Sequence, residues 1–197
     1  MRTITRTYDL FQLAELSAAA RDTAYNEWLR TFEYGWESDN RNTLEAFESV
    51  FKVKVNDWSY DTCRYSYRFT SRYSGEEEEL CGIRLLKYIV NNYWHTLFKP
   101  RTYYLKGNYK KRRKSRVFTD NCCVLTGYCA DEDILRPIYD FLKAPDNTTL
   151  YELMDRCLDR FFKACRDDME YQFSEEAFAE SCEANDYEFL SDGTMFN

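Results

Sequence analysis

The chain has 197 residues, of which 34 are acidic and 27 are basic, and its formal net charge is −7. Its single histidine, His95, excludes a metal site built from several imidazoles and leaves one candidate for a histidine general base. No apolar run approaches the roughly 18 residues of a membrane-spanning helix, and the N-terminus lacks the apolar region of a secretory signal. We therefore expect a protein of the cytoplasm whose eight cysteines are reduced thiols.

The first part of the chain changes from helical to strand periodicity. An apolar helical stripe around Tyr25 and Trp28 follows Ser17, which is a suitable N-cap. Apolar and polar residues then alternate, and a change of phase near Asn56 and Asp57 indicates a β-bulge. The predicted elements are a strand at 3–8, helices at 17–34 and 42–50, and antiparallel strands at 51–60 and 63–72.

The middle of the chain predicts one central helix followed by a basic segment. Residues 74–79 contain four consecutive glutamates and are expected to form a solvated loop. The helix predicted at 80–98 ends before Pro100, because the residue before a proline is disfavoured in helical conformation. Residues 101–119 predict either a β-hairpin or a long loop. The apolar stripe of the central helix consists of Ile83, Leu86, Val90, Tyr93 and Leu97.

The last third of the chain predicts helices at 131–143 and 149–184. Ser174 divides the second of these, since a serine followed by Glu175 and Glu176 is typical of a helix N-terminus. Because runs of strands are segregated from runs of helices, we predict an α+β fold with a small antiparallel sheet packed against a helical C-terminal half. We expect a single domain over 1–197, with a basic hairpin or loop at 101–119 and an acidic helical part at 131–197.

Charge is distributed unevenly along the sequence. Residues 1–98 carry 12 basic and 15 acidic side chains, whereas residues 99–116 carry nine basic and no acidic ones. Residues 117–197 carry six basic and 19 acidic side chains, and no lysine or arginine follows Arg166. Such local charge acts on any approaching molecule, because screening in physiological salt is effective only beyond about 8–10 Å.

Few residues of the chain suggest catalysis or cofactor binding. The phosphate-binding glycine motifs and the common hydrolase and deaminase signatures are absent. Cys122, Cys123 and Cys129 lack the C-x2-C spacing of a zinc site, so we expect no metal and no cofactor. His95 is expected to be a buried structural histidine, although a Cys–His pair stays formally open. Paired carboxylates such as Asp131 with Asp133 and Asp167 with Asp168 act as general acid and base only at a defined separation in a cleft, and we predict no catalytic residue.

Two charged features are candidates for binding a macromolecule. The acidic face comprises Asp167, Asp168, Glu170, Glu175, Glu176, Glu180 and Glu183, and it suits a protein partner with a basic surface. The basic tract comprises Lys110, Lys111, Arg112, Arg113, Lys114 and Arg116, and it suits nucleic acid through release of counterions from phosphates. The basic tract also suits a protein partner or the acidic third of the chain itself, and both features are equally compatible with solvated surface.

Several segments of the sequence resemble one protein family. They are ITRTYDLFQLAELSAAARDTA, DWSYDTCRYSYRF and the long C-terminal stretch that begins YCADEDILRPIYDFLKAPDN. The sequence is similar to small acidic proteins from phages and mobile elements of Firmicutes that are labelled antitoxin of a toxin–antitoxin stability system. Some similar mobile-element proteins are anti-CRISPR or other anti-defence inhibitors. The resemblance carries no catalytic motif and no assigned functional residue.

The resemblance and the charge pattern both favour a stoichiometric binder over an enzyme. The leading hypothesis is a phage or mobile-element inhibitor, acting in the bacterial cytoplasm, that neutralises a toxin or a CRISPR or other defence effector through charged surfaces. The alternative is a nucleic-acid-binding accessory protein that uses the basic tract. A third hypothesis, an unrecognised hydrolase, requires a cleft with convergent carboxylates or a Cys–His pair.

Overall fold

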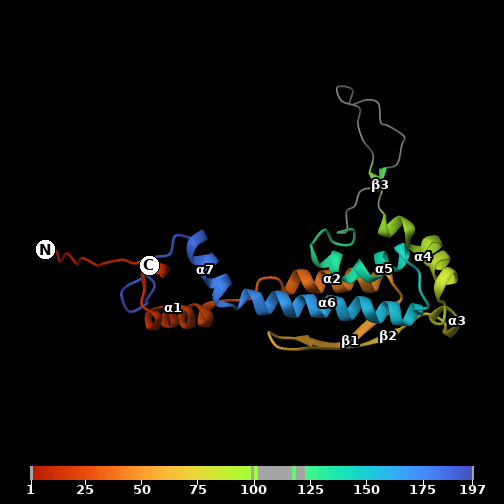
Figure 1. Cartoon of the computed structure of the whole chain (residues 1–197), viewed down its shortest axis with the longest axis horizontal. Helices are drawn as coiled ribbons and strands as arrows, with labels where there is room; N and C mark the ends of the chain where they lie inside the picture. Colours follow the sequence, from red (N-terminus) through yellow and green to blue (C-terminus); the bar gives the residue numbers. More distant parts are fainter. Residues whose placement is uncertain (1, 99, 102–116, 119–122, 197) are drawn as a thin grey trace, which may run out of the picture. The chain divides into compact units, whose positions relative to one another are not determined.

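The computed structural model describes residues 2–98, 100–101, 117–118 and 123–196. Helices and a small antiparallel sheet, with helices in the C-terminal half, confirm the predicted α+β class (Figure 1). The chain divides into two compact units: unit 1 is Met1–Gly35 with Asp167–Asn197, and unit 2 is Trp36–Arg166. Each unit has its own apolar core. The single domain expected over 1–197 stays a prediction.

Unit 2 is built around the long helix α6. Phe47 and Phe51 pack in one core with Ile134 of α5 and with Phe161 and Phe162 of α6. All five are at most 1% exposed, so each of these large side chains removes nearly all of its apolar surface from water. The helices of this region are α2 (Glu37–Val50), α3 (Gly75–Glu78), α4 (Gly82–Leu97), α5 (Ala130–Lys143) and α6 (Leu150–Gln172), of which α6 continues past the unit boundary.

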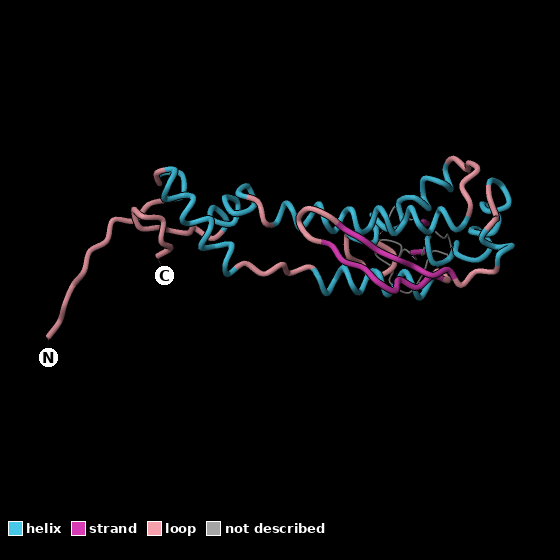
Figure 2. Tube along the Cα trace, turned by 90° about the horizontal axis from the view of Figure 1, so that it is seen from below, coloured by secondary structure: helices cyan, strands magenta, loops and turns pink. Residues whose placement is uncertain are grey.

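A β-hairpin lies along α6 (Figure 2). Its strands, β1 (Val53–Tyr60) and β2 (Tyr65–Ser71), pair antiparallel, and the register shifts between Val55 and Asp57. That shift confirms the bulge that the change of phase predicted. The Phe162 ring contacts Trp58 at 5.7 Å and Tyr67 at 5.2 Å between ring centroids. The inner face of the hairpin is therefore held by the aromatic side chains of α6.

The base of the segment at 101–119 is paired. Strand β3 (Pro100–Arg101) and strand β4 (Val117–Phe118) form an antiparallel ladder, as the hairpin alternative requires. The basic tract lies between these strands and outside the described residues.

Unit 1 joins the two ends of the chain. It contains the short 3-10 helix η1 (Leu13–Glu15), helix α1 (Ala18–Thr31) and helix α7 (Glu175–Ala184). The predicted caps are confirmed, since Ser17 Oγ accepts from the Ala20 N–H at 3.3 Å and Ser174 Oγ accepts from the Ala177 N–H at 3.1 Å. The buried residues of this smaller core are Leu16, Ala20, Ala24, Phe178, Cys182 and Phe189.

The closing turn of the chain packs closely on α1. Phe189 pairs with Phe11 through two backbone hydrogen bonds of 2.9 Å, and it also bridges Met195. Gly193 has a φ of +91°, and a Cβ added there would lie 2.0 Å from the Ala20 carbonyl oxygen. Glycine is therefore required at this turn, for both backbone conformation and space.

Several local predictions differ from the structure, including the helix predicted at 42–50, which begins at Glu37. The strand at 3–8 was wrong: these residues have no regular structure, and Ile4 is 71% exposed, because no strand in the described ranges pairs with the segment. The predicted loop at 74–79 contains α3, which Ser74 and Glu77 stabilise through a capping box. Of the stripe predicted for α4, Tyr93 and Leu97 are buried as expected, whereas Ile83 and Val90 are exposed.

Candidate functional site

The acidic face lies entirely in unit 1, on the last turns of α6 and along α7. Glu176, Glu180 and Glu183 recur at the spacing of one helix face, while Phe178 and Cys182 occupy the buried face of the same helix. The fold therefore places these glutamates in solvent, because the apolar residues between them anchor α7 to the core.

Two carboxylates of the acidic face accept hydrogen bonds from tyrosines. Tyr34 donates to Asp168 Oδ2 at 2.6 Å, which leaves Asp168 half-buried. Tyr171 donates to Glu180 Oε2 at 2.8 Å, and this bond raises the pKa of Tyr171 because it stabilises the neutral phenol beside a carboxylate. Asp168 was predicted as a contact residue, but its carboxylate is partly committed to Tyr34.

The glutamates of the acidic face are exposed, and none forms an ion pair with another described residue. They are Glu170, Glu175, Glu176, Glu180 and Glu183. Unit 1 as a whole carries 15 acidic and four basic side chains, a net charge of −11, whereas unit 2 carries a net charge of +4. The strong negative potential belongs to unit 1.

The acidic pair Asp131 and Asp133 serves separate structural contacts. Asp131 is fully buried, and its carboxylate accepts from the N–H groups of residues 125–127 at 2.7 to 3.0 Å and from two threonine hydroxyls. Asp133 instead faces the guanidinium of Arg160 at 3.4 Å, and partial burial raises its pKa. Each carboxylate has its own partners, and Asp131 holds the loop before α5 in place.

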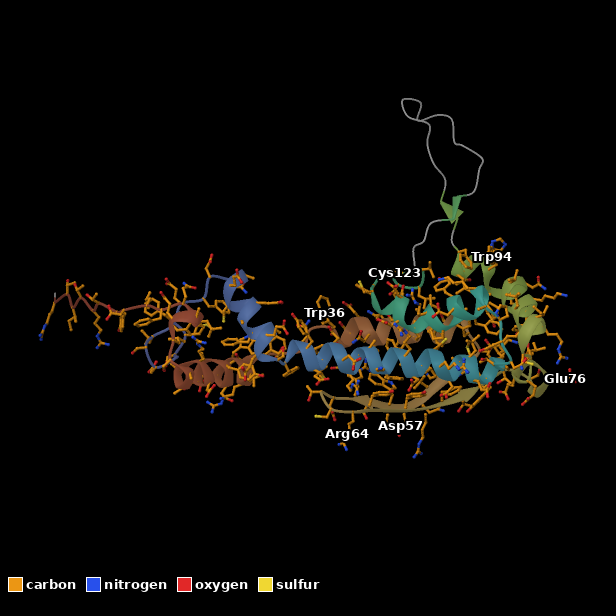
Figure 3. The ribbon with its side chains drawn as sticks, viewed as in Figure 1. Trp36, Asp57, Arg64, Glu76, Trp94 and Cys123 are labelled. Atoms are coloured by element: carbon orange, nitrogen blue, oxygen red, sulfur yellow. The ribbon has the colours of Figure 1, made fainter. Side chains whose placement is uncertain are left out.

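The lone histidine is exposed, so its expected burial was wrong. His95 lies on α4, close in sequence to Trp94, which is labelled in Figure 3 and contacts Phe98 at 4.2 Å between ring centroids. Because α4 buries the stripe through Leu85 and Ile89, His95 falls on the outer side of the helix.

Helix α4 also carries exposed cations that the sequence prediction did not include. Arg84 and Lys87 are exposed, and neither forms an ion pair within the ranges that the structure describes. No carboxylate occurs in the sequence between Glu79 and Asp120. The cationic face of α4, which we define as Arg84 and Lys87, therefore precedes the basic tract without an intervening acid.

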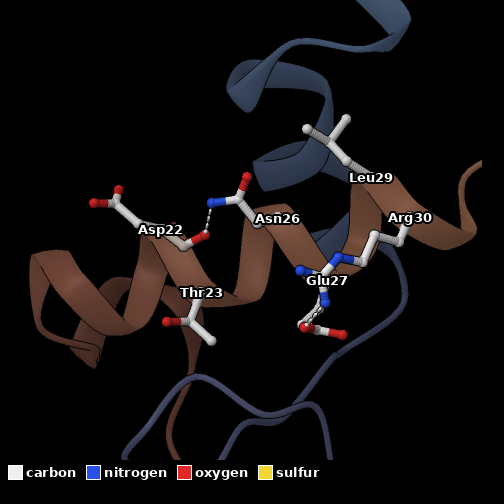
Figure 4. A pocket seen from close by; sticks show the side chains of 6 residues that line it. All are labelled: Asp22, Thr23, Asn26, Glu27, Leu29 and Arg30. Carbon is white, nitrogen blue, oxygen red and sulfur yellow. Dashed lines mark hydrogen bonds and ion pairs between the residues drawn. The ribbon is translucent and has the colours of Figure 1, made fainter.

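Two hollows lie among the described residues of unit 1, and one of them is the outer surface of a single helix. Its volume is 490 Å³, and its lining residues are Asp22, Thr23, Asn26, Glu27, Leu29 and Arg30 of α1 (Figure 4). Asn26 donates to the Asp22 carbonyl at 2.7 Å, and Arg30 pairs with Glu27, so these polar groups satisfy one another. The second hollow is a groove of 510 Å³ between η1, α1 and α7.

The described cysteines do not form a metal site. Cys157 and Cys182 are buried free thiols, and burial raises the pKa of Cys182 to about 11. Within the described ranges, no group of three or more histidine, cysteine, aspartate or glutamate side chains is positioned to hold a metal ion. Cys122 of the CC-x5-C cluster lies outside those ranges. Likewise, no described helix is both long and apolar enough to cross a membrane.

Comparison with protein-family models, curated proteins and solved structures gives no match for this chain. The resemblance to mobile-element antitoxins and anti-defence proteins therefore stays a prediction. The acidic face, the groove beside it and the cationic face of α4 are the candidate sites that the geometry provides. The cations of α4 were readable from the long stretch without carboxylates, whereas no sequence signal marks the groove, because its walls come from opposite ends of the chain.

Proposed function

We propose that the protein is a stoichiometric inhibitor that docks its acidic face on a basic surface of another macromolecule. The partner would be a toxin or a nucleic-acid-handling defence effector of the CRISPR type, met in the cytoplasm of a bacterial host. The observation that carries this proposal is the row of exposed glutamates without ion pairs on α7, within a unit of net charge −11. Complementary charge speeds encounter and selects the partner.

A binding role also accounts for how the acidic residues are used. Asp131 and Asp133, which are neighbours in the sequence, accept instead from a loop and from Arg160. The glutamates of α7, by contrast, contribute no ion pair to the stability of the described fold. Surface charges with no internal partner are available to another molecule.

The proposal is tested by reversing Glu175, Glu176, Glu180 and Glu183 to lysine. We expect capture of the partner from a host extract, quantified by mass spectrometry, to fall by about tenfold or more. The matched control reverses four exposed carboxylates elsewhere, Glu33, Glu45, Glu76 and Glu79, which changes the net charge by the same amount. Equal capture by both variants and the wild type would show that the acidic face is not the docking surface.

A second function, nucleic-acid binding, is favoured by the cationic face of α4. Arg84 and Lys87 extend the positive charge of the basic tract onto a helix, where the side chains are held at a regular spacing. This function predicts that affinity for a short oligonucleotide falls steeply with salt. Replacing Arg84 and Lys87 with alanine should reduce the slope of log affinity against log salt concentration by about two, because two fewer counterions are released. Replacing the ion-paired Arg30 and Arg41 with alanine should leave that slope unchanged. Salt-insensitive binding would eliminate this function.

A further inference from the structure

The groove of unit 1 opens beside the acidic face. One wall is η1, the second is α1 through Arg21, Asp22 and Tyr25, and the third is α7 through the segment from Glu175 to Glu183. All three walls belong to unit 1. The volume of 510 Å³ falls within the range of about 300–1,000 Å³ that is typical of binding pockets.

The floor of the groove is apolar. Its accessible apolar surface comes from Leu13 and Tyr25, which are half-buried, and from the exposed Ala179. Beneath them, Phe178 and Cys182 are 2% and 3% exposed and lie one turn apart on the buried face of α7. Tyr25 packs against Phe178 at 5.7 Å between centroids, and its hydroxyl donates to the Phe173 carbonyl at 2.6 Å. Burial raises the pKa of the Cys182 thiol to about 11, so the thiol stays neutral well above pH 7. Ala179, the small exposed residue between them, leaves the space open.

The rim of the groove is acidic. Asp22, Glu175 and Glu183 line it, and none of the three forms an ion pair with a residue that the structure describes. The one cation in the lining, Arg21, donates to the carbonyls of Ala14 at 2.7 Å and Leu16 at 3.1 Å. The Arg21 guanidinium thus holds η1, the wall of the groove that precedes α1, in place.

We propose that this groove receives an apolar side chain from a cationic segment of the partner protein. The apolar floor would bury that anchor, while lysine or arginine residues beside it in the partner would meet Asp22, Glu175 and Glu183. Buried anchors of this kind supply most of the affinity at protein interfaces, and surrounding charges supply selectivity. This inference rests on the proposed inhibitory function and adds the chemistry of the segment that is recognised.

The test uses the full chain and two short labelled peptides of equal positive charge. One places leucine and lysine at the 3.6-residue period of an amphipathic helix, and the other has serine in place of each leucine. The groove is filled by Ala179→Trp, and Ala184→Trp is the control, because Ala184 is an exposed residue at the end of the same helix and does not line the groove. Fluorescence anisotropy reports binding, and circular dichroism shows whether both variants are folded. If Ala179→Trp is not folded, Ala179→Met is used in its place.

We expect the leucine–lysine peptide to bind the wild type and Ala184→Trp equally, and to bind Ala179→Trp about tenfold more weakly. The serine–lysine peptide should bind all three proteins alike. Equal binding of the leucine–lysine peptide to Ala179→Trp and to the wild type would overturn the proposed role of the groove. The same result would not contradict the acidic face as a docking surface. If charge reversal of the α7 glutamates changed the binding of neither peptide, the proposed function itself would fail. A self-associated wild type that Ala179→Trp converts to a monomer would assign the groove to a second copy, against this proposal.

Discussion

At the scale of single residues, acidic side chains that look alike in the sequence have different tasks. Asp131 is enclosed and holds a loop, Asp133 faces Arg160, and Glu175 is exposed without an ion pair among the described residues. Neighbouring carboxylates do not mark a site unless they are directed at the same space, and here burial separates their roles.

Replacing Asp131 with alanine should lower the free energy of unfolding by about 3 to 5 kcal/mol, because three buried N–H groups lose their acceptor. Asp133→Ala should cost less than about 1 kcal/mol, since its ion pair with Arg160 is partly exposed. Urea denaturation followed by circular dichroism measures both. Similar losses in the two variants would show that the loop does not depend on the Asp131 carboxylate.

Glu77 is predicted to make folding sensitive to acid. Its carboxylate accepts from the Ser74 N–H, from Tyr88 and from Lys52, and these bonds lower its pKa from 4.5 to about 2. A lowered pKa in the folded state stabilises the fold above pH 4.5, and this stabilisation is lost as the pH falls toward 2. Glu77→Gln should therefore be less stable at neutral pH and lose less stability on acidification. A urea midpoint that falls equally with pH in both proteins would contradict this.

At the scale of secondary structure, α6 is the element on which unit 2 depends. A two-stranded sheet is marginal alone, and the contacts of Trp58 and Tyr67 with Phe162 show what stabilises the hairpin. For helix α4, by contrast, the rest of the core decides which side of the helix is buried. Its sequence has apolar residues on two adjacent stripes, and packing against the rest of the core selects the one through Leu85 and Ile89.

Phe162→Ala should lower the free energy of unfolding of unit 2 by about 3 to 5 kcal/mol, because it removes a fully buried ring that contacts both the hairpin and the core. The control Lys163→Ala changes the exposed neighbour on the same helix and should stay within about 0.5 kcal/mol of the wild type. Thermal unfolding separates the two. A small effect of Phe162→Ala would mean that the hairpin does not rely on α6.

At the scale of the whole molecule, net charge and core size differ between the two units. Unit 1 carries most of the negative charge and buries few apolar residues, whereas unit 2 carries a small positive charge and a large core. Self-repulsion among the carboxylates of unit 1 destabilises it further, while the same charges favour a basic partner.

We expect the amide protons of α7 to exchange at a lower opening free energy than those of α5, because the core that holds α7 is smaller. Native-state hydrogen exchange followed by mass spectrometry measures both helices in one sample. Equal opening free energies would show that the chain unfolds as the single domain that the sequence predicts.

The sequence alone determined the helices at 17–34 and 131–143, the antiparallel hairpin with its bulge, the caps Ser17 and Ser174 and the acidic character of α7. These features depend on local spacing and on residue chemistry, which are readable without neighbours. Tertiary structure decided that residues 3–8 form no strand, which stripe of α4 is buried, that Asp131 is enclosed, and that η1, α1 and α7 together form a groove. Each of these depends on which distant segment packs against a residue, and packing is a property of the folded chain.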